Sequence, residues 1–138
     1  MKKDEPKKLI VDEFNFFLKK IKAKPNPAEI LFYFSALYGV VNRVYNIEYD
    51  IRFLYLHEVL TSVYNAFLNA VNTSKAGTTP SLIQEKHFKR LTELVAELNA
   101  CIKNDFEGVH SIYEKLIELK YTTTGNGYYL LERGKIKL

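Results

Sequence analysis

The sequence predicts an all-α protein, a four-helix bundle of long antiparallel helices in one domain that spans residues 1–138. Apolar residues recur at intervals of three and four through most of the chain, which places them along one face of a helix. Short connections join the periodic segments, so neighbouring helices must run antiparallel. The composition, 47% hydrophobic and 14% aromatic, is that of a globular protein that can bury one core without disulfides or metal.

The middle of the chain predicts a helical hairpin. Its two apolar seams, separated only by a connection near 47–50, consist of Ile30, Phe34, Leu37, Val41 and Val44 and of Phe53, Leu56, Leu60, Val63, Phe67 and Ala70. Phe32, Tyr33 and Val40 lie on the far side of the first of these helices, which is therefore apolar in nearly every direction. Such a helix must be covered by other helices or by another chain. We therefore expect a central position for it and a homo-oligomer.

The flanking segments predict the remaining helices. A first helix capped by Asp4 carries the seam Ile10, Phe14, Phe17 and Ile21, and Asn26 with Pro27 begins the next one. After a connection at 72–80, Thr79 and Pro80 start a helix whose buried stripe includes Phe88, Leu91, Leu98 and either Cys101 or Ile102. The pattern breaks or bends at 104–108 and resumes from Val109 to Leu119, which allows a short fifth helix. Residues 121–138 form an irregular loop or a small hairpin around Gly125, Asn126 and Gly127.

Charge and cysteine content restrict the cellular setting. The net charge is +4, and the excess lies at the two ends, with eight lysines against four acids in residues 1–24. This is typical of a solvated face more than of a nucleic-acid partner, although a phosphate-rich partner stays open. The sequence has no run of apolar residues long enough to span a membrane, and residues 1–8 do not form an apolar signal. The single cysteine, Cys101, fits a reducing compartment, so we expect a cytoplasmic protein without membrane contact.

The segment YTTTGNGYYLLERGKIKL, residues 121–138, contains a possible phosphate site. It resembles the glycine-containing segment of ATP:cob(I)alamin adenosyltransferases, Y-T-x-T-G-D-x-G followed by a basic cluster. The resemblance implies a trimeric helical bundle that binds ATP, with site residues at Thr122, Thr124, Gly125, Asn126, Arg133 and Lys135. Threonine hydroxyls, backbone N–H groups near glycines and basic side chains can together hold a triphosphate. The alternative is that Thr-Gly-Asn-Gly is simply a turn.

Arg52 and His57, in IRFLYLHEV, suggest a different chemistry. Their spacing resembles the R-x4-6-H signature of HEPN domains, helical bundles that often act as metal-independent ribonucleases. The resemblance implies that the two residues stabilise charge and move a proton beside an RNA phosphate. Five residues of a regular helix separate side chains by about 140°, so joint action needs a local distortion or a dimer. The alternative is that both residues are structural.

Metal chemistry is not predicted. Glu107 and His110 have the E-x-x-H spacing of di-iron bundles, but the sequence holds no second copy of this motif. Three classes of function therefore stay open, and whether the protein is an enzyme stays open with them. They are a nucleotide-binding bundle, a ribonuclease or RNA-binding bundle, and a non-catalytic oligomeric interaction module built on Phe32, Tyr33 and Val40.

Overall fold

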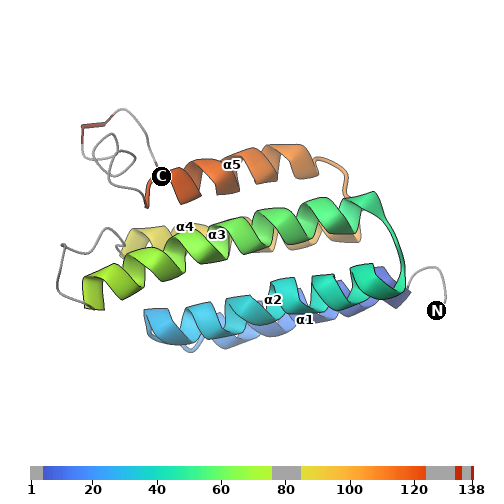
Figure 1. Cartoon of the computed structure of the whole chain (residues 1–138), viewed down its shortest axis with the longest axis horizontal. Helices are drawn as coiled ribbons and strands as arrows, with labels where there is room; N and C mark the ends of the chain where they lie inside the picture. Colours follow the sequence, from blue (N-terminus) through green and yellow to red (C-terminus); the bar gives the residue numbers. More distant parts are fainter. Residues whose placement is uncertain (1–4, 76–84, 124–132, 135–137) are drawn as a thin grey trace.

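The computed structural model describes residues 5–75, 85–123, 133–134 and 138, except the side chains of 73–75, and this part of the chain consists of helices with turns and short irregular connections. Its helices are α1 (Glu5–Ile21), α2 (Pro27–Ile47), α3 (Ile51–Lys75), α4 (Glu85–Lys103) and α5 (Val109–Tyr121). Consecutive helices run in opposite directions along one long axis (Figure 1). The predicted all-α class is confirmed.

The helices pack in a closed ring. α1 packs against α2 and α4, α2 against α3, and α5 against both α3 and α4. In Figure 1, α1 lies behind α2 and α4 lies behind α3. α5 lies on the side of α3 and α4 that is opposite α1 and α2. Each helix therefore has two principal neighbours and keeps an outer side that no other described helix covers.

The predicted seams form the core. Every residue of the two hairpin seams is buried, as are Ile10, Phe14 and Phe17 of α1. The α4 stripe and the α5 residues Val109, Ile112, Tyr113, Leu116 and Leu119 join the same cluster. Cys101 and Ile21 lie at its edge, half-buried. The prediction of which face each helix buries is thus confirmed.

The ends of the helices follow local sequence rules. The Oδ1 atom of Asn26 accepts a hydrogen bond from the backbone N–H of Glu29 at 2.9 Å, and the Glu29 side chain approaches the Asn26 N–H at 3.5 Å, which together form a capping box. Between α4 and α5 the backbone adopts the left-handed region at Asp105, Phe106 and Gly108, which produces the predicted break. The predictions for Asp4, for Thr79 and Pro80, and for a hairpin at 125–127 lie outside the described residues.

Polar contacts between helices add to the apolar core. Asn99 in α4 donates its Nδ2–H to Oδ1 of Asn15 in α1 at 2.9 Å, and the Lys120 ammonium donates to the Ser62 hydroxyl at 2.7 Å. These bonds tie α4 to α1 and α5 to α3, and they favour one register in each pair. Within the described residues, we find no helix whose length and apolar content would let it cross a membrane.

Candidate functional site: an apolar outer face on α1 and α2

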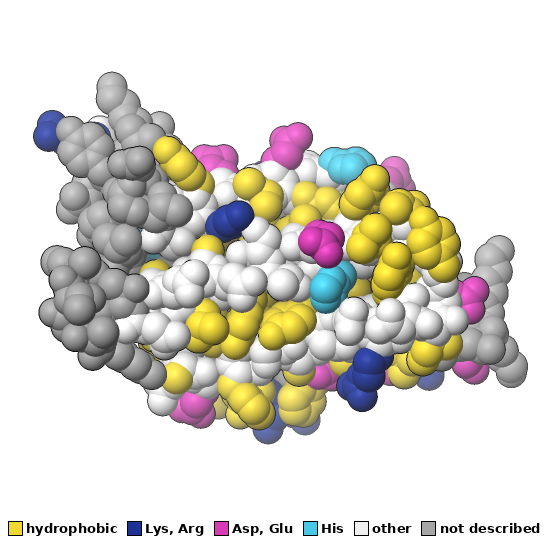
Figure 2. All heavy atoms as spheres, in the orientation of Figure 1, with side chains coloured by type: hydrophobic (Ala, Val, Ile, Leu, Met, Phe, Trp, Pro, Cys, Tyr) yellow, Lys and Arg dark blue, Asp and Glu magenta, His cyan; other side chains and the backbone are white. Residues whose placement is uncertain are grey.

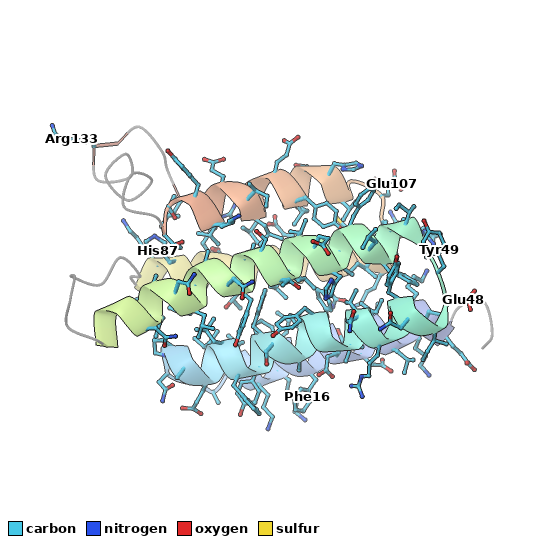
Figure 3. All side chains as sticks on the ribbon, in the orientation of Figure 1. Phe16, Glu48, Tyr49, His87, Glu107 and Arg133 are labelled. Carbon is cyan, nitrogen blue, oxygen red and sulfur yellow. The ribbon has the colours of Figure 1, made fainter. Side chains whose placement is uncertain are left out.

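The outer side of α2 carries a group of apolar side chains although no described helix packs on it. Phe32 exposes 72% of its surface, and Tyr33 and Val40 are half-buried. On the neighbouring helix α1, Leu9 and Phe16 each expose 46%. Figure 3 shows Phe16 pointing away from the bundle. We call this surface, formed by Leu9, Phe16, Phe32, Tyr33, Ala36 and Val40, the α1–α2 face.

Edge contacts hold the aromatic rings of the α1–α2 face in place. The Tyr33 ring lies 6.4 Å from the Phe16 ring and 5.6 Å from the Phe32 ring, with interplanar angles of 77° and 68°. Both contacts have the T-shaped geometry that aromatic quadrupoles favour. The Lys20 ammonium lies 5.3 Å from the centre of the Phe16 ring and limits its freedom further. The rings are therefore arranged before any partner binds, which lowers the entropy cost of covering them.

Small residues occupy the centre of the outer side of α2. A Cβ atom built on Gly39 would meet no atom within 4 Å, so packing inside the chain does not explain a glycine in the middle of a 21-residue helix. Ala36 and Ser35 lie one turn away. The Ser35 hydroxyl donates to the carbonyl of Phe32 at 2.7 Å, so it presents no unsatisfied donor to a partner. This region permits another backbone to approach closely.

A second apolar region lies at the end of the bundle where α2 joins α3. Figure 2 shows apolar side chains gathered at that end, over the beginning of α3. Its exposed members are Ile47, Tyr49, Ile51 and Tyr55, and the Tyr49 ring lies 5.8 Å from that of Tyr45. This region is separated from Phe16 and Phe32 by several turns of helix, and it offers matched control positions.

Arg52, the first residue of the ribonuclease-like pair, is tied to the start of α3. Its Nη2 atom lies 2.7 Å from Oδ2 of Asp50, and its backbone N–H donates to Oδ1 of Asp50 at 2.9 Å. The guanidinium also lies 4.9 Å from the centre of the Phe106 ring in the α4–α5 turn. The hydrogen bonds from Arg52 lower the pKa of Asp50 from its ordinary value, and Asp50 raises the pKa of Arg52. These contacts give Arg52 a structural role.

His57 contacts other partners. Its ring packs edge-on against Tyr38 of α2, with the ring centres 6.2 Å apart, and its Nε2 atom lies 3.4 Å from the Thr61 hydroxyl. The Nδ1 atom lies 3.5 Å from a carboxylate oxygen of Glu58. Arg52 thus reaches toward the α4–α5 turn, whereas His57 faces α2. Neither residue shares a described partner with the other, as their spacing on a helix indicates.

The predicted nucleotide residues are described only in part. Thr122 is buried just after α5, and its hydroxyl donates to the carbonyl of Leu119 at 2.6 Å. Arg133 is exposed. Thr124, Gly125, Asn126 and Lys135 lie outside the described residues.

A small pocket nevertheless adjoins Thr122. It has a volume of about 50 Å³ and is lined by Arg90, Lys115, Glu118, Leu119, Thr122 and Leu138. The sequence alone does not predict that Arg90 and Lys115 line one pocket, because they belong to different helices and each lies among ordinary surface charges of both signs. Two cations beside a threonine can attract an anion, although Glu118 offsets part of their charge.

The described residues contain no group of three or more His, Cys, Asp and Glu that could hold a metal ion. Glu107 accepts a hydrogen bond from Asn104 at 3.0 Å in the α4–α5 turn, and the His110 ring lies 6.2 Å from the Tyr113 ring. Burial, with a smaller contribution from Glu97, raises the pKa of the Cys101 thiol above its ordinary value. The thiol is therefore held in its less nucleophilic form.

The fold and its surfaces define a class, an all-α protein of packed antiparallel helices with an apolar outer face. We compared the chain with protein-family models, with curated proteins and with solved structures, and none of them matches it. The likeness to adenosyltransferases therefore rests on residues 121–138 alone.

Proposed function

We propose that the chain is a non-catalytic association module, in which the short fifth helix α5 completes the bundle of α1 to α4 and the α1–α2 face is covered by protein. The observation that carries the proposal is Phe32, an aromatic side chain that is 72% exposed between small and apolar neighbours. Isolated exposed apolar residues are ordinary on soluble proteins, but a contiguous ordered group of them marks an interaction surface.

The energy available at Phe32 is large enough to matter. A phenylalanine presents about 200 Å². Covering Phe32 therefore removes roughly 140 Å² of surface from water, which favours association by about 2 kcal/mol before the entropy cost of binding is subtracted. Phe16 and Leu9 extend the surface and add to this term. Fixed rings lose little conformational freedom on binding, so much of the gain is kept.

Sedimentation velocity over a series of protein concentrations tests the proposal. We expect the unmodified chain to form an oligomer and Phe32→Ser to sediment as a monomer with an unchanged helical circular dichroism spectrum. Tyr49→Ser is the matched control, because Tyr49 is 73% exposed at the other apolar region. A chain that remains monomeric at the highest concentration would contradict the proposal, as would equal effects of the two substitutions.

The second candidate function is binding of a nucleotide, ATP, through residues 121–138. It is favoured by one observation: Thr122, a residue of the adenosyltransferase-like motif, adjoins a pocket that also contains Arg90 and Lys115. In this proposal the two cations hold phosphate oxygens, and Thr124, Gly125, Asn126, Arg133 and Lys135 complete the site.

Thermal denaturation with ATP or inorganic triphosphate tests this second candidate. We expect either compound to raise the melting temperature, and Arg90→Gln to reduce the shift. Lys89→Gln is the matched control, because Lys89 is adjacent in α4 but is exposed and does not line the pocket. An unchanged melting temperature at millimolar ATP would eliminate the nucleotide proposal and leave the association module unaffected.

A further inference from the structure

We infer that the protein covering the α1–α2 face is a second copy of this chain, whose α2 crosses the first α2 antiparallel about a two-fold axis at Ala36. This inference rests on the proposed association through the α1–α2 face and names its partner and geometry. The trimer implied by the adenosyltransferase resemblance is the competing assembly.

The inference begins with the spacing of residues on the outer side of α2. Positions 29, 32, 36, 40 and 43 are separated by three, four, four and three residues, so they line one side of the helix. The spacing is the same in both directions from Ala36. In an antiparallel pair with its axis at Ala36, residues equally distant from Ala36 face each other across the interface. Glu29 then faces Arg43 of the second copy, and Phe32 faces Val40.

The chemistry of the facing residues is complementary. Glu29 and Arg43 are both exposed and have opposite charges, so a two-fold axis produces two ion pairs, one at each end of the contact. The exposed Phe32 ring meets Val40, an apolar residue that is half-buried in its own chain. A parallel arrangement would instead bring Glu29 against Glu29 and Arg43 against Arg43. The charges therefore select the antiparallel orientation.

The centre of the interface is shaped for close approach. Ala36 lies on the axis, and Gly39 is next to it with open space where a Cβ atom would stand. Glycine makes a helix less stable than alanine does, and no contact among the described residues requires it here. A second helix that approaches over Ala36 and Gly39 explains why small residues occupy this position. Leu9 and Phe16 of α1 lie beside the contact and widen it.

The Asn26 cap of α2 survives the charge substitutions that test this arrangement. The shorter of its two bonds runs from the backbone N–H of Glu29 to the Asn26 side chain, so it does not need the Glu29 carboxylate. Loss of the longer contact at 3.5 Å costs little. Changes of oligomeric state on substituting Glu29 can therefore be separated from changes of fold by circular dichroism.

A charge exchange followed by sedimentation equilibrium is the test. We expect Glu29→Arg and Arg43→Glu each to weaken the dimer about ten-fold or more, because each replaces two attractive contacts by two repulsive ones. The double variant Glu29→Arg/Arg43→Glu restores the attraction and returns the dissociation constant to within about three-fold of the unmodified chain. Lack of recovery in the double variant would overturn the antiparallel arrangement.

Cross-linking provides a second readout that does not depend on charge. In a Cys101→Ser background, Ala36→Cys places one thiol on the two-fold axis, where two helices in contact bring the Cα atoms within disulfide range. We expect rapid covalent dimer formation under mild oxidation, and little for the control Lys89→Cys in the same background. If Phe32→Ser dissociates the assembly but the Ala36→Cys variant does not cross-link, the two-fold geometry is wrong while the association module stands. If the unmodified chain is a monomer, the proposed association and its two-fold geometry are both wrong.

Discussion

Replacing Asp50 by alanine should destabilise the protein, because one side chain both caps α3 and fixes Arg52. The carboxylate accepts the backbone N–H of Arg52 at 2.9 Å and a guanidinium hydrogen bond at 2.7 Å. Loss of the cap costs about 1 kcal/mol. The ion pair adds at most about 0.5 kcal/mol, because the Arg52 side chain is 47% exposed and solvent screens it. We therefore expect Asp50→Ala to lower the free energy of unfolding by about 1.5 kcal/mol.

The pH dependence of this loss has a definite sign. Arg52 lowers the pKa of Asp50 in the folded protein, so the unfolded chain takes up a proton first as pH falls. The stabilisation by the charged carboxylate is present above the unfolded pKa of about 3.9 and is lost as pH falls through the lower folded value. The difference between the unmodified protein and Asp50→Ala should therefore shrink below about pH 4. Urea denaturation at neutral pH and at about pH 3 measures it.

A double-mutant cycle with Arg52→Ala completes the test. Arg52→Ala alone should cost about 1 kcal/mol, from the ion pair and from the cation–π contact with Phe106. In the Asp50→Ala background the same substitution should cost about 0.5 kcal/mol less, which is the coupling between the two residues. Asp50→Asn is the control, since it keeps an acceptor for the cap but removes the charge. Additive effects, or an Arg52→Ala protein as stable as the parent, would refute the structural role of this pair.

Three further predictions concern single positions. In the background of Phe32→Ser, which we expect to be monomeric, Gly39→Ala should raise the free energy of unfolding in urea by about 0.5–1 kcal/mol, because the new methyl group meets open space. Without Phe32→Ser, Gly39→Ala should weaken the proposed dimer. Tyr113→Phe should be neutral to stabilising at neutral pH, because its buried hydroxyl has no hydrogen-bond partner among the described residues. Burial raises the pKa of Tyr113, so the unmodified protein should also lose stability as pH rises above about 10, and the variant should lose less. Cys101 should react with iodoacetamide at about pH 8 more slowly in the folded protein than in urea, because burial disfavours its thiolate; equal rates would contradict this.

Local rules account for most of the fold that the sequence predicts. The seam from Ile30 to Val44 could be placed because helical periodicity determines which face is buried. Asn26 and Pro27 mark the start of α2 because asparagine is a favourable N-cap and proline is tolerated in the first turn of a helix. Glu29, three residues after Asn26, completes the capping-box spacing. The break after Lys103 follows from residues that weaken helices. None of these predictions needs information about distant parts of the chain.

Tertiary arrangement was not predictable in the same way. The periodicity of α2 shows that several of its sides are apolar, but it does not show which neighbour covers each side. The sequence predicts a central helix, whereas only α1 and α3 pack closely on α2 among the described helices, and Phe32 stays exposed. Likewise, Arg90 and Lys115 meet at one pocket only because α4 and α5 are neighbours. Such pairs leave no spacing signal in a single sequence.

Comparison of α2 with α4 shows that the ring of helices does not itself require an apolar outer face. Each of these two helices has two principal neighbours, and each keeps an outer side toward solvent. On α4 that side carries exposed charges at Glu85, Lys86, Lys89, Glu93 and Glu97. On α2 the exposed aromatic Phe32 lies next to the half-buried Ala36 and Val40, and the charged residues are only Glu29 and Arg43, with the neutral Asn42 and Asn46 also exposed. Since the same packing position tolerates a charged surface on α4, the packing of the described helices does not explain why Phe32 is exposed on α2, and the partner that we propose would explain it by removing Phe32 from water.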